Sequence, residues 1–198
     1  MHKGDAITEP DNTEDERLLS YEWPSDNGAS IDIKIVAASW DTALIYDLKA
    51  RGPAMLDLIA VRLSLDPQRV SVFLCNDEDM RAINKIHRGV YKATNVLSFP
   101  ADHDLQRAGD MPADEVTIGD IAIAAETVMR EASETGIAAG DHLLHLFTHG
   151  MLHLLGYDHE EDSPAAEMEG LEIDLLAQLN ISNPYHGDHL GFGMREID

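Results

Sequence analysis

The chain has 198 residues, of which 44% are hydrophobic, which is typical of one globular domain with a substantial core. Its one cysteine, Cys75, excludes an intramolecular disulfide, and its position at the end of an apolar run predicts a buried structural thiol. The sequence contains no apolar run of the ~20 residues that a membrane-spanning helix needs, and no apolar stretch typical of a signal peptide. These features together predict a cytoplasmic protein.

The net charge of −23 is unevenly distributed along the chain. Residues 1–30 carry eight acidic and two basic residues, a net charge of −6, and residues 156–198 carry eleven acidic residues and one basic residue, a net charge of −10. Strong overall acidity disfavours a nucleic-acid partner, because phosphates repel it. The 125 residues between the two segments carry a net charge of only −7, so the argument against nucleic-acid binding is weaker for this part of the chain.

The N-terminal half is predicted to begin with a disordered acidic extension, residues 1–30, which is polar and shows no hydrophobic periodicity. The helix that follows the first strand is expected to break near Gly52 and Pro53. Asp77 is the expected cap of the second helix, and Gly89 is its expected end. The predicted elements are a strand at 31–36, a helix at 40–63, a strand at 69–75 and a helix from 77 to 89.

The C-terminal half is predicted to contain two further strands, joined by a segment long enough to be functional or disordered, and then three helices. The strands are expected at 95–100 and 118–124, the joining segment at 101–117, and the helices at 125–135, from Asp141 to Gly156 and from Ser163 onward. Residues 182–198 are expected to be a loosely ordered C-terminal tail. Residues 31–181 therefore predict a single α+β domain, with a small mixed central sheet of about four strands flanked by helices.

A histidine motif lies on the predicted helix that ends at Gly156. His149 and His153 are four residues apart, so on a helix they share one face and can bind the same metal ion. Gly156 can adopt the positive φ of a helix end, which would turn the chain and bring His159 toward the other two histidines. Three imidazoles suit Zn²⁺, with nickel, copper or iron as competitors, and leave a coordination position for water. One zinc ion per chain is the expected cofactor.

The spacing of these histidines matches the long zincin motif except at one position. Where zincins have the glutamate that serves as general base in peptide hydrolysis, this chain has Gly150. The metal ligands are therefore predicted, while a metallopeptidase is disfavoured. A histidine pair alone is more often structural, and it is the turn glycine with the third histidine that favours a metal site.

Further polar residues accompany the motif. His145 lies one turn before His149 on a helix that is otherwise apolar, so it is predicted either to support a ligand or to face the substrate, with a plain hydrogen-bonded histidine as the alternative. Asp158 adjoins a ligand and is expected to hold an imidazole from behind. Asp120, in an apolar strand, is expected to orient a ligand or to pair with Arg88, with a capping role as the alternative.

A basic stripe stands out in an otherwise acidic chain. Its members recur at spacings of four, three and four residues around the end of the second predicted helix, which favours a groove for a polyanion such as single-stranded nucleic acid. The alternative is a solvated helix face, which is the commoner meaning of such a pattern. The basic stripe comprises Arg81, Lys85, Arg88 and Lys92.

The motif from His149 to His159 resembles the signature of the bacterial YbeY family of metal-dependent endoribonucleases. Three further stretches agree with that family, and together they span about residues 31–181: Ile83-Asn84-x-x-His87-Arg88-Gly89, Thr94-Asn95-Val96-Leu97-Ser98-Phe99-Pro100, and Gly119-Asp120-Ile121. The family usually has Tyr before the arginine, where this chain has His87, and Asp where it has Asn95.

The resemblance implies single-strand-specific cleavage of RNA in the 3′-end maturation of 16S rRNA and in ribosome quality control. It also implies cooperation with a small-subunit ribosomal protein and the GTPase Era, and it identifies Arg88 as the functional arginine. The leading hypothesis is hydrolysis, in which the metal held by His149 and its partners lowers the pKa of water from 15.7 to about 7 and Arg88 neutralises transition-state charge. Attack by the RNA 2′-hydroxyl is the alternative route. An assembly factor with a structural metal and a metallopeptidase are the competing functions.

Overall fold

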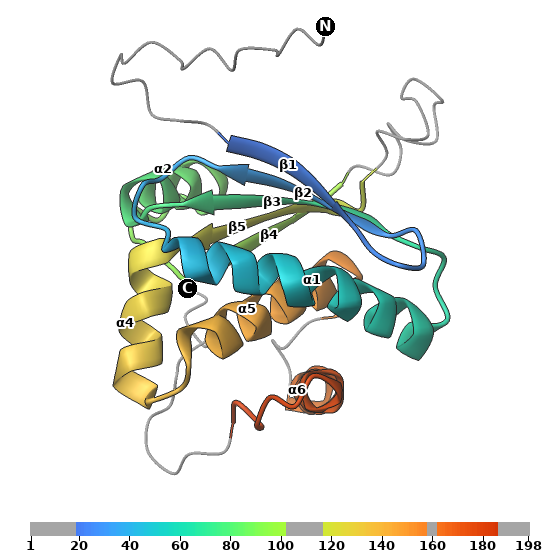
Figure 1. The fold of residues 1–198 in the computed structure, drawn as a ribbon. Coiled ribbons are helices and arrows are strands. Elements are labelled where there is room, and N and C mark those ends of the chain that lie inside the picture. The colour runs from blue at the N-terminus through green and yellow to red at the C-terminus, as the bar shows by residue number, and fades with distance from the viewer. Residues whose placement is uncertain (1–18, 102–116, 158–161, 186–198) are drawn as a thin grey trace, which may run out of the picture.

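The computed structural model describes residues 19–101, 117–157 and 162–185 of the chain. Five strands form one mixed sheet in the order β1-β2-β3-β5-β4 (Figure 1). Strands β2, β3 and β5 are parallel to one another, while the two edge strands, β1 and β4, run antiparallel to their neighbours. The strands are β1 (Leu19–Pro24), β2 (Ser30–Ile35), β3 (Arg69–Cys75), β4 (Val96–Pro100) and β5 (Gly119–Ala124).

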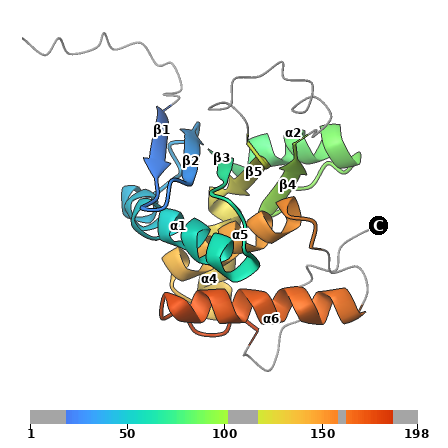
Figure 2. The ribbon, with the colours of Figure 1, turned by 90° about the vertical axis from the view of Figure 1, so that its right-hand side faces the viewer.

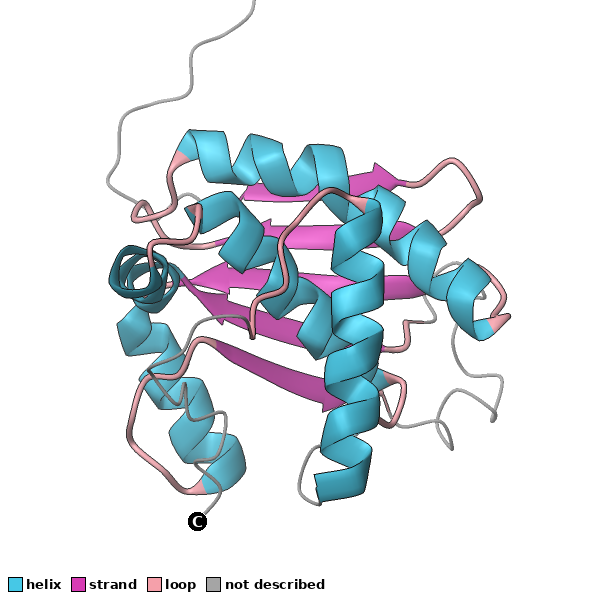
Figure 3. Ribbon diagram, turned by 90° about the horizontal axis from the view of Figure 1, so that it is seen from below, coloured by secondary structure: helices cyan, strands magenta, loops and turns pink. Residues whose placement is uncertain are grey.

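Helices cover both faces of this sheet. Helix α2 lies on one face, and α1 and α5 lie on the other, where they run obliquely along the strands (Figures 1 and 3). Helix α6 forms a further layer on the far side of α5 (Figure 2). The helices are α1 (Thr42–Leu63), α2 (Asp77–Arg88), α4 (Ala125–Thr135), α5 (Ala139–Leu154) and α6 (Asp162–Gln178). The predicted α+β domain with a mixed central sheet is confirmed, with one strand more than expected.

The central strands bury side chains on both faces, which explains their nearly continuous apolar sequences. Ile121 and Ile123 of β5 face the large core under α1 and α5, while Ala122 and Ala124 face a smaller core under α2. The Cys75 thiol belongs to the smaller core, and burial raises its pKa to about 12, as expected for a structural thiol. None of the helices in the described part of the chain combines the length and apolarity needed to span a bilayer.

Helix α5 is the central helix of the fold. It packs against β4 and β5 on one side and against α1, α4 and α6 on the others. Almost every one of its residues from His142 to Leu154 is buried. The apolar circumference of its sequence is therefore satisfied by protein on all sides, and the polar residues on it must find partners inside the molecule.

The prediction that residues 1–30 are a disordered extension is wrong for residues 19–30. Residues 19–24 form the edge strand β1, and its Trp23 is buried in the large core. The acidic composition was misleading because residues 19–24 pair with β2 and bury Trp23, while Arg69 of β3 pairs with Glu22 at 2.6 Å. Residues 1–18 lie outside the described residues.

Three helix details also differ from the sequence prediction. Helix α1 continues through Pro53 without a break, because its packing against β2 holds together a helix that lacks one backbone donor. The cap of α2 is Asn76, whose side chain accepts from the Asp79 amide, rather than Asp77. Asp141 does not cap α5 but lies in its first turn, where it pairs with Arg51 at 2.6 Å.

Replacing Trp23 by Ala should lower the free energy of unfolding by about 3–5 kcal/mol, because a large buried side chain leaves a cavity in the core. Tyr21→Ala is the matched control: Tyr21 belongs to the same strand but is 48% exposed, whereas Trp23 is 4% exposed. The control should cost about 1 kcal/mol or less. Urea unfolding followed by circular dichroism measures both, and equal losses would show that β1 is not integrated into the core.

Candidate metal centre

The last turns of α5 bring His149 and His153 together. Their Nε2 atoms lie 2.9 Å apart, and the two rings meet edge to face with centroids 4.5 Å apart. Just beyond the helix, Gly156 has a φ of +89°, so the chain turns away at the position that the sequence predicted. The structure therefore places two of the three predicted ligands with their Nε2 atoms converging on one point.

The other ring nitrogen of each histidine fixes its tautomer. The Nδ1 of His153 lies 3.0 Å from the backbone oxygen of Tyr157, and since a carbonyl oxygen only accepts, this Nδ1 must donate. The Nδ1 of His149 lies 2.8 Å from Oε1 of Glu172 and donates to that carboxylate in the same way. In the neutral form of each ring, Nε2 then carries the lone pair, and the two Nε2 atoms lie close together on rings that meet edge to face.

Glu172, on α6, is the residue that organises this site, and the sequence analysis missed it. Its side chain is fully buried, and its Oε2 lies 2.8 Å from Nε2 of His145 while Oε1 receives His149. The Tyr185 hydroxyl also donates to Oε2. Burial is the largest single effect on Glu172 and opposes its ionisation, but the hydrogen bonds from His145 and His149 outweigh it and lower its pKa to about 2.

A sequence signal for Glu172 existed. Met168 and Leu175 mark the apolar stripe of α6, and Glu172 lies between them at helical spacings of four and three residues. A carboxylate on the core-facing side of a helix is costly unless it is paired, so its position predicts a buried cationic or hydrogen-bonded partner. The apolar periodicity alone locates the helix but does not identify Glu172 as a buried, paired residue.

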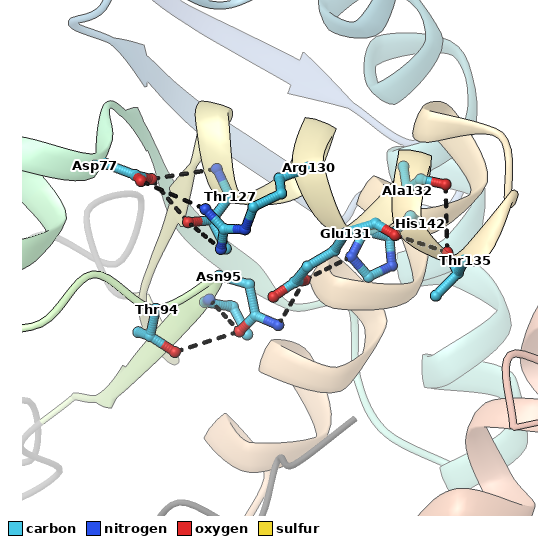
Figure 4. A network of polar contacts seen from close by, with 10 residues as sticks. Asp77, Thr94, Asn95, Thr127, Arg130, Glu131, Ala132, Thr135 and His142 are labelled. Atoms are coloured by element: carbon cyan, nitrogen blue, oxygen red, sulfur yellow. Dashed lines mark hydrogen bonds and ion pairs between the residues drawn. The ribbon is translucent and has the colours of Figure 1, made fainter. Parts of the chain in front are cut away.

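His145 and His142 are both held by carboxylates inside the protein. His145 is buried and bound to Glu172, a position that favours support of the neighbouring imidazole over contact with a substrate. His142 lies 2.8 Å from Oε2 of Glu131 on α4, and the same oxygen accepts from Asn95 at 3.1 Å (Figure 4). The amide of Asn95 thus supplies a donor that an aspartate at this position would lack.

The network in Figure 4 continues on the α2 side of α4. Asp77, the first residue of α2, accepts from the backbone and the hydroxyl of Thr127. Arg130, one turn later on α4, donates to the same hydroxyl. Helix α4 is therefore tied by polar side chains to α5 through Glu131 and to α2 through Thr127, which fixes the start of both helices relative to the sheet.

Gly150 faces the sheet and not the histidines. A Cβ atom at this position would lie 3.0 Å from Ile121 and 3.1 Å from the Ser98 hydroxyl, which itself donates to the Gly150 carbonyl at 3.2 Å. The glycine therefore allows α5 to approach β4 and β5 closely. A glutamate here would enter the core instead of the ligand cluster, which removes the geometric basis of a zincin-type peptidase.

The basic stripe lies on the opposite face of the sheet from α5, and β4 connects the two. Ser98 of β4 contacts α5, while its neighbour Phe99 packs on His87 of α2, with ring centroids 4.4 Å apart. The end of α2 and the end of α5 therefore flank the same point of this edge strand. The stripe and the histidine pair lie on opposite faces of the sheet, whereas a groove beside the metal would need them on one face. Helices α2 and α5 both contact the edge strand β4.

The four basic side chains of the stripe have different surroundings. Arg81 pairs with Glu78 at 2.8 Å, and the Lys85 ammonium lies 5.4 Å from the centre of the Tyr91 ring. Arg88, at the last position of α2 before the Gly89 cap, is exposed and forms no ion pair within the described residues. Lys92 is exposed in the loop that follows, and its carbonyl accepts from the buried Asn84. Arg88 is thus better placed than Arg81 to receive an external anion.

For three of the predicted site residues, the described part of the chain shows no contact with the histidine pair. His159 and Asp158 lie outside the described residues. Asp120 is exposed on β5, and within the described residues its carboxylate contacts neither Arg88 nor a ligand histidine. No group of three or more metal-binding side chains occurs in the described part of the chain, which contains two of the three predicted ligands.

Comparison with known proteins agrees with these features. The sequence model of the family described as "Endoribonuclease YbeY" matches residues 47–180. The chain belongs to the YbeY family. The matched residues include α2, the edge strand β4, the histidine pair on α5 and Glu172 on α6.

Individual relatives match over most of their length. The chain is 51% identical over 166 residues to the endoribonuclease YbeY of Rhizobium etli, covering 81% of this chain and 95% of that protein. It is 41% identical over 170 residues to the endoribonuclease YbeY of Dinoroseobacter shibae, covering 79% and 91%. The solution structure of TM1509 from Thermotoga maritima aligns with a TM-score of 0.46 at 25% identity, covering 80% of this chain and 98% of that one.

The donor set of this YbeY family member fits a transition-metal ion. Two imidazole nitrogens that both carry lone pairs and lie 2.9 Å apart repel each other unless they share a proton or a cation. Each imidazole is also fixed from behind, His149 by a carboxylate and His153 by a backbone carbonyl, as is usual for metal-bound histidines. Imidazole nitrogens suit zinc and its neighbours in the periodic table better than Mg²⁺ or Ca²⁺.

Replacing Glu172 by Gln should lower the free energy of unfolding by about 3 kcal/mol, because an amide nitrogen would face one of the donors that the carboxylate now accepts. Glu167→Gln, at an exposed position of the same helix, removes the same charge and should change stability by less than about 0.5 kcal/mol. Chemical denaturation of both variants provides the comparison. A Glu172→Gln protein as stable as the control would contradict the organising role of this carboxylate.

Proposed function

We propose that this protein is a metal-dependent endoribonuclease that hydrolyses phosphodiester bonds of single-stranded RNA. The observation that carries the proposal is the converging pair of Nε2 atoms of His149 and His153, 2.9 Å apart, in a chain that matches the endoribonuclease YbeY family over residues 47–180. The identity to proteins named as endoribonucleases supports the reaction class, and the donor set supports dependence on a metal.

We propose one zinc ion per chain, held by His149, His153 and His159. When bound, the ion supplies a Lewis acid that lowers the pKa of water and polarises a phosphoryl oxygen. The chain's own residues position the ligands. Glu172 fixes the His149 ring, the Tyr157 carbonyl fixes the His153 ring, and the two Nε2 atoms lie 2.9 Å apart. His149 is thereby a catalytic residue through its place at the reacting site.

Arg88 is proposed to bind the phosphate of the RNA and to neutralise the negative charge that develops during cleavage. It is exposed at the end of α2, on the other side of β4 from the histidine pair. A guanidinium group suits this role because it donates two parallel hydrogen bonds to a phosphate. Lys85 and Lys92 are proposed to extend the contact along the RNA backbone, and Arg81 to contribute less because of its pairing with Glu78.

The proposed substrate is the 3′-end region of the 16S rRNA precursor, and the proposed partners are a small-subunit ribosomal protein and the GTPase Era, in rRNA maturation and ribosome quality control. These parts of the proposal rest on the family resemblance. The net charge of −23 is consistent with a partner that helps to bring the protein to its RNA, since a strongly acidic protein alone is repelled by a polyanion.

The test is cleavage of a single-stranded RNA by purified protein reconstituted with zinc, beside His153→Ala and a duplex of the same sequence. We expect cleavage of the single strand only, one metal per wild-type chain by elemental analysis, and loss of both cleavage and metal in the variant. Product ends bearing a 2′,3′-cyclic phosphate would indicate attack by the RNA hydroxyl instead of water. Equal cleavage by His153→Ala would refute a metal-dependent reaction, and bound metal without cleavage would favour the assembly-factor alternative.

Arg88→Ala should reduce RNA cleavage at least 100-fold, a loss of about 3 kcal/mol of transition-state stabilisation, while metal content and melting temperature stay near wild type. Arg88→Lys should restore little activity, because it keeps the charge but not the planar pair of donors. The dependence of RNA affinity on salt should also become shallower by about one unit of log–log slope for the lost phosphate contact.

Arg81→Ala is the matched control, because Arg81 lies two turns earlier on the same helix and is already paired with Glu78. It should leave cleavage within about threefold of wild type, as expected for a weak surface ion pair. If Arg81→Ala and Arg88→Ala had the same effect on cleavage and on the salt slope, the two residues would be parts of one solvated face and Arg88 would have no specific role.

A further inference from the structure

Tyr185 comes from a segment that the sequence analysis assigned to a loosely ordered tail and that lies beyond residues 47–180, the part matched by the family. Contacts of both its backbone and its side chain hold it in place. The backbone amide of Tyr185 donates to Oδ1 of Asn183 at 2.8 Å, which fixes the turn after α6. Its ring meets His145 edge to face with centroids 5.6 Å apart, and its hydroxyl donates to Oε2 of Glu172.

The hydroxyl of Tyr185 completes the set of donors around a fully buried carboxylate. Oε1 of Glu172 accepts a hydrogen bond from His149. Oε2 accepts from both His145 and the Tyr185 hydroxyl. The two oxygens of a carboxylate move together, because the group is planar and rotates about a single bond. Whatever holds Oε2 therefore also sets the direction of Oε1, and with it the orientation of the His149 ring.

Tyr185 reaches from the surface to the buried carboxylate. The residue is 37% exposed, whereas Glu172, which its hydroxyl contacts, is fully buried. The low dielectric around Glu172 strengthens its hydrogen bonds to both histidines, and the same low dielectric makes the loss of one donor costly. A buried carboxylate needs hydrogen-bond donors from the protein, and Tyr185, which lies outside α5 and α6, supplies one of them.

We propose that Tyr185 is a positioning residue of the metal centre, which acts through Glu172 to hold the Nε2 atom of His149 toward the metal. The segment from Ser182 to Tyr185 is then a functional part of the site. This inference rests on the proposed metal site, and it adds to that site a residue outside the matched family region.

The test is the metal affinity of Tyr185→Phe, which keeps the ring against His145 and removes only the hydroxyl. Zn²⁺ affinity is measured by competition with a chromogenic chelator, and Co²⁺ is added as a spectroscopic probe of ligand geometry. Tyr46→Phe is the matched control, because it removes a hydroxyl from a side chain that is 66% exposed on α1. Circular dichroism and melting temperature of the metal-free proteins report on the fold separately.

We expect Tyr185→Phe to bind Zn²⁺ about fivefold to tenfold more weakly, less than the 10–100-fold typical for a direct partner of a ligand, because it acts through Glu172. The visible spectrum of the Co²⁺ protein should also change, which loss of stability alone would not cause. Tyr46→Phe should match wild type in both measurements.

A Tyr185→Phe protein with wild-type Zn²⁺ affinity and Co²⁺ spectrum would overturn the inference and leave the metal site intact. A wild-type protein that binds neither metal would overturn the metal site and the inference together. If Tyr185→Phe folds poorly, Tyr185→His supplies a ring and a hydrogen-bond donor, and recovery of affinity in that variant beyond Tyr185→Leu would support the role of the donor.

Discussion

The carboxylate of Glu172 is the interaction on which the histidine site depends, because it is buried completely in the layer between α5 and α6 and is ionised there. An isolated buried charge would destabilise the fold by several kcal/mol, and the hydrogen bonds from His145 and His149 offset that cost only in one arrangement of the two helices. The same contacts that make the charge tolerable also fix the tautomer of His149. The same hydrogen bonds therefore stabilise the packing of α6 on α5 and orient the His149 ring.

Two carboxylates hold three of the four histidines of helix α5. His142 is bound to Glu131 of α4, and His149 with His145 is bound to Glu172 of α6. A helix buried on all sides has no solvent to satisfy polar side chains, so each histidine on it needs a partner from a neighbouring element. These partners also set the rotation of α5 about its axis, and that rotation determines where His149 and His153 point.

The sequence predicted the parts of this molecule that depend on local pattern. Apolar alternation and helix-ending glycines located β3, α2, α4 and the end of α5, and the spacing of His149, Gly156 and His153 predicted a shared face and a turn. What it missed depends on partners distant in the sequence. Residues 19–24 form a strand because they pair with β2 and bury Trp23, and Glu172 lies within the apolar stripe of α6 because its histidine partners are on α5.

The edge strand β4 lies between the residues that we propose for metal binding and those that we propose for RNA binding. Successive side chains of a strand point to opposite faces, so Ser98 contacts α5 and Phe99 contacts α2. Gly150 lets α5 approach this strand closely, and the contact of His87 with Phe99 brings the Arg88 end of α2 to the other side of it. An RNA strand that reaches both the histidine pair and Arg88 must therefore pass around the edge of the sheet at β4. A flexible single strand can follow such a path more easily than a stiff duplex, which supports the single-stranded substrate that we propose.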